Sequence, residues 1–269
     1  MDAPPPVKRA AIVGTAQSCV QTPWDDHGLY IVCLNDAYSM GIPRFDCWMD
    51  LHPFDKMIFR PRDQTSVDAR ALPHGTYVRP AGHIEWLQTQ AASGKDVIVQ
   101  SVPDGWPATA QRFPIEQVLP FLQARGDAPG YVGSSPELIL AYLILQGYTE
   151  IHIYGIHLAT QAEYIKQRPS FEWVIGKASA MGITFILPTT CPLLKHSHIY
   201  GYEPEPEPLA MAQQQRLALL VQARAAVQME LIQWPRWKSK VVKLARLREL
   251  DAKVHDVQQQ IQRAHVYAA

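Results

Sequence analysis

The chain has no excess of charge of either sign, because 25 lysines and arginines balance 25 aspartates and glutamates over 269 residues. Such a chain lacks the overall field that would recruit nucleic acid or an anionic membrane surface. The charge is unevenly placed, however, since residues 209–269 contain ten basic and four acidic residues. This basic C-terminal segment hints at an acidic partner for that part of the chain.

Cysteine is scarce, with four residues that form no Cys-x-x-Cys pair. The spacing does not fit a secreted disulfide scaffold, so the sequence favours reduced thiols and a cytoplasmic protein. Long apolar runs are also missing, and none approaches the ~20 residues that cross a bilayer. Residues 1–6 are acidic and rich in proline, unlike a signal peptide. We therefore expect no membrane partner.

The segment Tyr131–Leu158 carries the clearest local pattern in the chain. Ser134 or Ser135 is placed to cap a helix, and Glu137 stands in its first turn, where the helix dipole favours an acid. Gly147 follows where a left-handed residue commonly ends a helix. The segment therefore predicts a helix that stops at Gly147 and leads into a strand.

The strand expected next, Glu150–Gly155, is followed by the polar stretch His157–Arg168. That stretch is poor in regular pattern, which predicts an irregular loop. In an open α/β sheet, the loop at the carboxyl end of a strand is where ligands bind.

Short continuous apolar runs predict strands, and amphipathic runs predict helices between them. The predicted strands are Arg9–Val13, Tyr30–Leu34, Phe45–Met49, Thr76–Arg79, Val97–Ser101, Ile151–Tyr154 and Thr184–Leu187. The predicted helices are Ile84–Ala92, Ile115–Ala124, Pro136–Gln146 and Ser170–Met181. This alternation predicts an α/β fold with a mainly parallel sheet.

The alternating proline and glutamate of residues 202–208 predict a stiff, extended linker. It separates a body, residues 1–201, from a C-terminal appendage, residues 209–269, which is almost free of glycine. Pro235 divides this appendage into two helical segments, so we expect a helical hairpin. Its long helices offer a surface for a homodimer.

Polar and small residues follow four of the predicted strands, and the carboxyl ends of parallel strands meet at one edge of a sheet. Amides and hydroxyls in such turns can face a phosphate, and a carboxamide can read a ribose or a base. Plain turns and helix caps are the alternative. The candidate nucleotide-binding residues are Gly14, Thr15, Gln17, Ser18, Asn35, Asp36, Gly155, Gln167 and Arg168.

The order of these motifs resembles the bacterial sialyltransferases that have a single Rossmann-like domain and use CMP-sialic acid without a metal. It also resembles the related MptE-like pyrophosphokinases and uncharacterised phage proteins. The likeness spans roughly residues 7–195 and is carried by Val13–Ser18, Cys33–Asn35 with Tyr38, Asp50–Pro53, Ser134–Leu158 and Leu187–Leu194. It implies a Rossmann-like three-layer sandwich that binds a nucleotide or nucleotide sugar, and it adds Ser134, Ser135, Pro188 and Thr189 to the nucleotide-binding residues.

The family's pattern is incomplete in this chain. The family has an arginine just before its Ser-Gly turn, but Gly126–Gly133 contains no arginine. The aspartate of the family's Gly-Ile-Asp run is replaced here by His157. The resemblance therefore implies glycosyl transfer from a nucleotide sugar but leaves the sugar open.

Transfer of a sugar needs a base that removes the proton of the acceptor hydroxyl and a group that stabilises the leaving phosphate. His157, Glu163 and His52 are the candidate bases, and Arg168 is a candidate phosphate ligand. A loop histidine bonded to backbone and a surface salt bridge are the alternatives for His157 and Arg168. No Asp-x-Asp pair stands where a metal-dependent glycosyltransferase holds its ion, so we expect neither a metal nor another cofactor.

The C-terminal appendage, residues 209–269, permits other functions. Trp234–Lys240, with Lys243, Arg246 and Arg248, interleaves aromatic and basic residues, a composition that can bind nucleic acid. The same stripe can be the exposed face of a helix that packs on its own domain or on a second copy. One alternative is therefore a phage-type glycosyltransferase of DNA bases, acting in the host cytoplasm. The other is a non-catalytic nucleotide-binding or sequestering protein.

Overall fold

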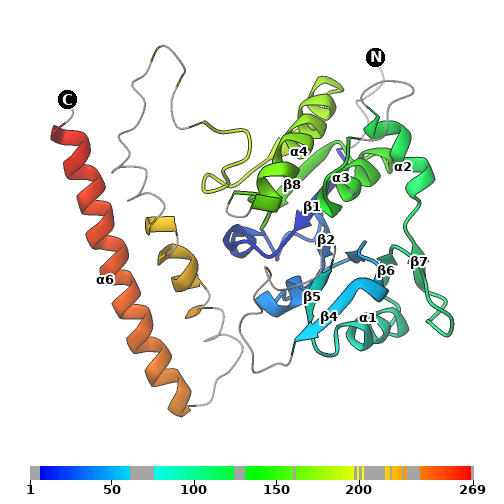
Figure 1. The fold of residues 1–269 in the computed structure, drawn as a ribbon, viewed down its shortest axis with the longest axis horizontal. Helices are drawn as coiled ribbons and strands as arrows, with labels where there is room; N and C mark the ends of the chain where they lie inside the picture. The colour runs from blue at the N-terminus through cyan, green and yellow to red at the C-terminus, as the bar shows by residue number, and fades with distance from the viewer. Residues whose placement is uncertain are drawn as a thin grey trace. The chain divides into compact units, whose positions relative to one another are not determined.

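The computed structural model describes residues 7–60, 76–123, 131–159, 162–196, 199, 202, 216–218, 220–225, 227–228 and 237–267. The chain forms two compact units, Met1–Leu193 and Leu194–Ala269 (Figure 1). The first unit contains the sheet and the second contains the C-terminal helices.

The first unit is built on a seven-stranded sheet whose strands are all parallel. The strands lie in the order β7-β6-β3-β2-β1-β8-β9. Their bounds are β1 (Arg9–Val13), β2 (Tyr30–Leu34), β3 (Cys47–Asp50), β6 (Asp96–Val99), β7 (Ala110–Arg112), β8 (Glu150–Tyr154) and β9 (Thr184–Ile186).

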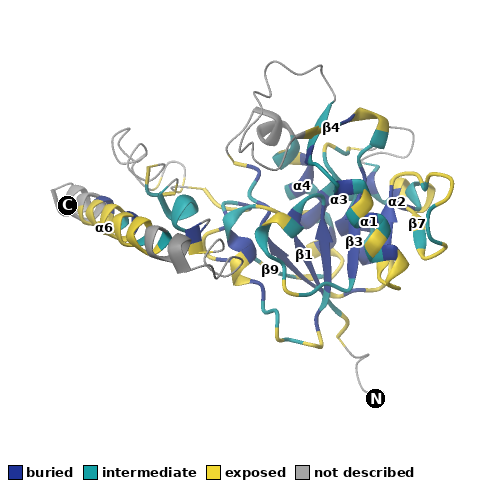
Figure 2. Cartoon of the chain, turned by 90° about the horizontal axis from the view of Figure 1, so that it is seen from below, coloured by how far each residue is buried: buried dark blue, intermediate teal, exposed yellow. Residues whose placement is uncertain are grey.

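Two separate apolar cores cover the two faces of this sheet, because successive residues of a strand point to opposite sides. One core packs the sheet against α2 (Ile115–Leu122), α3 (Ser135–Leu145) and α4 (Ala162–Ala180). The other packs it against α1 (His83–Ala92) and the short 3₁₀ helices η1 (Gln17–Gln21) and η2 (Ala37–Met40). Figure 2 shows the buried strands between these layers, so the predicted three-layer α/β sandwich is confirmed.

The strand order reverses at β1, which pairs with β2 on one side and with β8 on the other. From β1 the chain proceeds outward through β2, β3, β6 and β7 before it crosses back to β8 and β9. The topological switch point therefore lies between the carboxyl ends of β1 and β8. In folds of this kind that is the position where a ligand binds.

Two details differ from the sequence prediction. The strand predicted at Thr76–Arg79 forms, as β5 (Tyr77–Pro80), but outside the main sheet, where it pairs with β4 (Met57–Arg60) in a separate two-stranded sheet. Neither β4 nor β7 was predicted. The residues of β7 are Ala-Gln-Arg, and this short edge strand lacks the apolar run on which a sequence prediction depends.

Helix α4 begins at Ala162, eight residues before the predicted start, and continues through Pro169. The predicted loop at His157–Arg168 is therefore wrong over its second half. Proline favours a helix boundary because it removes one backbone hydrogen bond. Ser170 and Phe171 directly after it are buried against the sheet, and this packing accompanies an uninterrupted helix.

In the second unit, helix α6 (Trp237–Tyr267) contacts the helical residues within 216–228. Arg224 pairs with Asp251 of α6 at 2.5 Å between Nε and Oδ1, and Leu250 and Val257 are buried. The two helical segments predicted here are confirmed and are in contact. Pro235 and, apart from Tyr202, the predicted linker at 202–208 lie outside the described residues. Among the described residues, no helix is long and apolar enough to cross a membrane.

Candidate functional site

Two groups of polar residues occupy the carboxyl edge of the sheet. The switch-point group consists of Gly14 and Ser18, which follow β1, and Gly155 and His157, which follow β8. The Asp50 network surrounds the last residue of β3 and contains Asp50, His52, Arg79, His83 and Tyr38. Both groups lie at the same edge of the sheet as the topological switch point.

Gly14 and Gly155 hold the two loops of the switch point together. Gly14 N–H donates to the Tyr154 carbonyl at 2.9 Å, and Ala16 N–H donates to the Gly155 carbonyl at 2.8 Å. A Cβ on Gly14 would come within 2.5 Å of the Gly155 oxygen, and a Cβ on Gly155 would overlap the Gly14 carbonyl. Gly155 also has a φ of 65°, in the left-handed region. Packing between the loops thus explains both glycines.

Ser18 joins the same two loops through its side chain, which is 1% exposed. Its Oγ accepts the Gly155 N–H at 2.8 Å and lies 2.9 Å from His157 Nε2. Burial lowers the pKa of His157, which favours the neutral ring. The Ser18 hydroxyl can donate to Nε2 or accept from it, so the contact fits either neutral tautomer. In the tautomer that accepts from Ser18, His157 presents an Nδ1–H donor at this edge.

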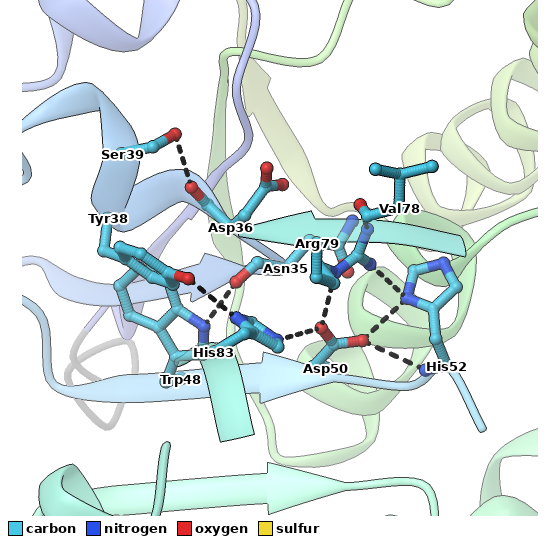
Figure 3. A network of polar contacts seen from close by, with 10 residues as sticks. All are labelled: Asn35, Asp36, Tyr38, Ser39, Trp48, Asp50, His52, Val78, Arg79 and His83. Carbon is cyan, nitrogen blue, oxygen red and sulfur yellow. Dashed lines mark hydrogen bonds and ion pairs between the residues drawn. The ribbon is translucent and has the colours of Figure 1, made fainter. Parts of the chain in front are cut away.

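Asp50 is fully buried and accepts four hydrogen bonds (Figure 3). Its Oδ2 lies 3.1 Å from Arg79 Nε and 2.9 Å from His83 Nε2. Its Oδ1 lies 2.6 Å from His52 Nδ1 and 3.1 Å from the His52 backbone nitrogen. Burial alone would raise the pKa of Asp50, but the hydrogen bonds from His52 and His83 and the charge of Arg79 outweigh it and hold the pKa well below its usual range.

His83, the first residue of α1, is held in one orientation by its two neighbours. The ring is inaccessible to solvent, with Nε2 facing Asp50 and Nδ1 lying 3.0 Å from the Tyr38 hydroxyl. Because an ionised carboxylate only accepts hydrogen bonds, His83 Nε2–H donates to Asp50. Tyr38 is in turn stacked on Trp86, with ring centroids 4.4 Å apart.

His52 is partly accessible to solvent, with a side chain 16% exposed. Its Nδ1 lies between the Asp50 carboxylate, at 2.6 Å, and Arg79 Nη2, at 2.7 Å. Its other nitrogen points away from Asp50 in Figure 3 and has no hydrogen-bond partner among the described residues. The ring lies against Tyr77, with centroids 4.1 Å apart. One imidazole nitrogen is thus fixed and the other is available.

Asn35 lies between the two groups, directly after β2. Its backbone has a φ of 55°, and its carbonyl accepts from Trp48 Nε1 at 2.9 Å. The side-chain Oδ1 is buried and has no hydrogen-bond partner in the part of the chain that the structure describes. A buried acceptor left unsatisfied costs roughly 1–3 kcal/mol of folding free energy. A donor from a ligand or a bound water would remove this cost. The neighbouring Asp36 uses its carbonyl to accept from Ser39 at 2.7 Å.

The serines before α3 have a structural role. Ser134 is the N-cap residue, as predicted, but its side chain does not cap the helix. Its hydroxyl instead lies 3.1 Å from a carboxylate oxygen of the buried Glu137, which also accepts from Ser170 at 2.7 Å and from Gly133 N–H at 2.6 Å. Ser135 is the first residue of the helix. Desolvation raises the pKa of Glu137.

The Arg168 guanidinium bonds to two other groups of the chain. Its Nε lies 2.8 Å from Glu172 Oε1, and its Nη2 donates to the Pro192 carbonyl at 2.6 Å. Gln167 lies one residue earlier in α4, close to Gly133. Glu163 is also in α4, but its side chain lies outside the described residues.

The remaining predicted residues lie around the switch point. Thr15 is exposed and Gln17 half-buried after β1, whereas Pro188 is buried and Thr189 exposed after β9. Thr190, next to Thr189, accepts from Gln21 of η1 at 3.2 Å, which connects the loop after β9 to the segment after β1. The structure therefore brings the loops after β1, β8 and β9 together, as the parallel sheet predicts.

Sequence reasoning singled out His52 but missed its partners. Arg79 is 29 residues and His83 33 residues from Asp50 along the chain. No local motif connects them, because β5 and the start of α1 are brought to β3 only by the fold. Asp50 itself belongs to the Asp50–Pro53 run, so a carboxylate two residues before a histidine was the one available signal.

Comparison with known protein families, curated proteins and solved structures found no match. Within the residues that the structure describes, no group of three or more histidine, cysteine, aspartate or glutamate side chains is arranged to hold a metal ion. The site is therefore interpreted from its geometry.

Proposed function

We propose that this protein is a glycosyltransferase that binds a nucleotide sugar at the carboxyl edge of its sheet, with the nucleotide at the switch point. The observation that carries the proposal is the hydrogen bond between Ser18 and His157, which joins the loops after β1 and β8 where the strand order reverses. This is the position at which open parallel sheets bind nucleotides.

The protonation of His157 suits the binding of a phosphate. Burial favours the neutral ring, and we assign its Nε2 as the acceptor of the Ser18 hydroxyl, which puts the ring proton on Nδ1. A neutral N–H donor can stabilise the negative charge that develops on a leaving phosphate oxygen. This argument assigns His157 to the nucleotide phosphate, rather than to the acceptor proton.

The neighbouring strand supplies a contact for the rest of the nucleotide. No described residue donates to the buried Oδ1 of Asn35, and a ribose hydroxyl or an exocyclic amine of a base would satisfy it. Thr15 and Gln17 have no hydrogen-bond partner among the described residues and stand beside the same loop. We assign these three side chains to the nucleoside part of the ligand.

The Asp50 network lies within reach of a ligand at the switch point. Strand β2 separates β1 from β3, so the ends of β1 and β3 are about 10 Å apart at the usual spacing between strands. A nucleotide sugar can span this distance, with its nucleoside near β1 and its sugar near β3. The polar network at the end of β3 therefore supports a position for the transferred sugar beside an acid–base group.

Thermal unfolding of the full chain with a panel of nucleotides and nucleotide sugars tests the proposal. A ligand present at 100 times its Kd stabilises the folded state by about 2.7 kcal/mol. For a unit of this size such a gain raises Tm by roughly 5–10 °C. The donor that gives the largest shift is then tested for transfer to an acceptor or to water.

The controls separate binding from catalysis. Ser18→Ala should reduce the shift, whereas Ser39→Ala, which removes an exposed hydroxyl outside the switch point, should leave it unchanged. A shift without any transfer would favour the non-catalytic nucleotide-binding protein. The absence of a shift with every nucleotide and nucleotide sugar would refute the proposal.

A further inference from the structure

We propose that His52 is the general base of the transfer reaction, with Asp50 and Arg79 as the positioning residues that fix its tautomer. This inference rests on the proposed function and assigns the acid–base step to one nitrogen, His52 Nε2. In this proposal the other two candidate bases, His157 and Glu163, do not take the acceptor proton.

The first step of the argument is orientation. A side-chain and a backbone hydrogen bond both join His52 to the same oxygen of Asp50, at 2.6 Å and 3.1 Å. Asp50 is immobilised by Arg79 and by His83, which is itself fixed by Tyr38. A ring held in this way keeps its free nitrogen in one direction, as a general base requires.

The second step concerns the proton on the ring. A carboxylate can only accept a hydrogen bond and a guanidinium can only donate one, yet both lie within 2.7 Å of His52 Nδ1. Asp50 therefore favours the tautomer with the proton on Nδ1, which leaves a lone pair on Nε2. Arg79 favours the opposite tautomer, in which Nε2 carries the proton and cannot act as a base.

The arrangement of charges decides between these tautomers. Asp50 is ionised, because its pKa is held well below the usual range, and it offers Oδ1 to His52 through two hydrogen bonds. Arg79 has other acceptors, since its Nε donates to Asp50 and its Nη1 donates to the Val78 carbonyl at 3.0 Å. Among residues 7–60 and the other described ranges, His52 has no second acceptor for an Nδ1 proton, whereas Arg79 retains two partners without His52.

The chemical step then balances. His52 Nε2 takes the proton of the acceptor hydroxyl while the acceptor oxygen forms a bond to the anomeric carbon of the donor. The bond between that carbon and the phosphate oxygen breaks, and its electron pair leaves with the nucleotide phosphate. The positive charge formed on His52 is adjacent to the Asp50 carboxylate, at 2.6 Å. His52 afterwards releases the proton to water.

The first experiment reads the tautomer directly and does not require turnover. Nitrogen-15 NMR of histidine in the full chain distinguishes a protonated Nδ1 from a protonated Nε2, and the signal lost in His52→Gln assigns the residue. We expect the proton on Nδ1 in the wild-type protein and a shift toward Nε2 in Asp50→Asn. A wild-type ring protonated on Nε2 alone would overturn the inference. If Asp50→Asn does not fold, the wild-type spectrum and the His52 variants still decide.

The second experiment measures transfer from the donor identified by thermal unfolding. His52→Gln should lower kcat by about 10²–10⁴-fold, the usual contribution of a general base, while the Tm shift with nucleotide stays that of the wild type. Added imidazole should restore part of the activity of His52→Ala. The matched control is His27→Gln, since His27 is an exposed histidine on the segment before β2.

The two proposals fail in different ways. A nucleotide shift together with an unchanged kcat in His52→Gln overturns the role of His52 and leaves the proposed function standing. A wild-type protein that shows no shift with any nucleotide overturns the proposed function, and the role of His52 as a base for transfer falls with it.

Discussion

The Asp50 carboxylate and the Arg79 guanidinium form an ion pair, 3.1 Å between Oδ2 and Nε, in which Asp50 is fully buried and Arg79 is 7% exposed. Two charges in such a position cost desolvation energy, and packing of apolar residues of similar volume is often at least as stabilising. The pair is therefore better explained by a role in the site than by stability alone.

Removal of one partner of this pair should destabilise the protein strongly. Asp50→Ala leaves the Arg79 charge buried and four donors without their acceptor, so we expect a loss of about 3–5 kcal/mol in the free energy of unfolding. Urea unfolding followed by circular dichroism measures it. Arg112→Ala, which breaks an exposed ion pair with Glu116, is the control and should leave the midpoint nearly unchanged. A small effect of Asp50→Ala would contradict the buried geometry.

Acid should destabilise the protein through Asp50. The folded-state pKa of Asp50 lies well below that of the unfolded chain, which is about 3.9 for an aspartate. The unfolded chain therefore binds more protons as the pH falls, so the stabilisation from Asp50 is complete above about pH 5 and is lost below it. Unfolding free energies between pH 6 and pH 3 should decline less steeply in Asp50→Asn than in the wild type. Equal slopes would refute this contribution.

Glu137 should have the opposite effect on the pH dependence of stability. Desolvation raises its folded-state pKa, so the folded chain binds more protons than the unfolded chain as the pH rises past the unfolded value of about 4.3. The contribution of Glu137 is therefore present at low pH and is lost as the pH rises through the folded pKa. Glu137→Gln keeps an acceptor for the Gly133 N–H and turns its amide nitrogen to the Ser134 and Ser170 hydroxyls, which can accept as well as donate. It should remove this part of the pH profile. An unchanged profile would contradict the raised pKa.

Gly155 should tolerate no side chain. Gly155→Ala combines a left-handed φ of 65° with an overlap of Cβ and the Gly14 carbonyl. Gly94→Ala is the matched control, because Gly94 has a φ of 84° but no atom within 4 Å of the added Cβ. We expect about 1–3 kcal/mol of backbone strain in both variants and a further loss in Gly155→Ala alone. Equal losses, measured by urea unfolding, would show that the two loops can separate without cost.

Ser18→Ala tests the connection across the switch point. It removes the acceptor of the buried Gly155 N–H, which should cost roughly 1–3 kcal/mol of stability. It also removes the donor to His157 Nε2, so this ring is free to change its tautomer. Nitrogen-15 NMR of His157 should show the proton on Nδ1 in the wild type and a mixture of both tautomers in Ser18→Ala. A wild-type proton on Nε2 would contradict the assignment.

The local sequence predicted every strand of the parallel sheet except β7, and most of the helices. Continuous apolar runs such as Tyr30–Leu34 are buried on both faces, and this pattern depends only on neighbouring residues. Gly147 ends α3 with a φ of 80°, as its place in the sequence predicts. The short polar strand β7 and the passage of α4 through Pro169 were missed, because there tertiary packing outweighs the local preference.

The candidate site was predictable only in part, for the same physical reason. The sequence by itself determined that polar residues follow β1, β2, β3 and β8, and a parallel sheet brings such ends to one edge. Only the tertiary structure decided that Ser18 bonds His157 across the switch point, and that Arg79 and His83 converge on Asp50. A strand or a helix end is set by the residues next to it, whereas these contacts join segments 29 to 139 residues apart, whose meeting depends on the packing of the whole core.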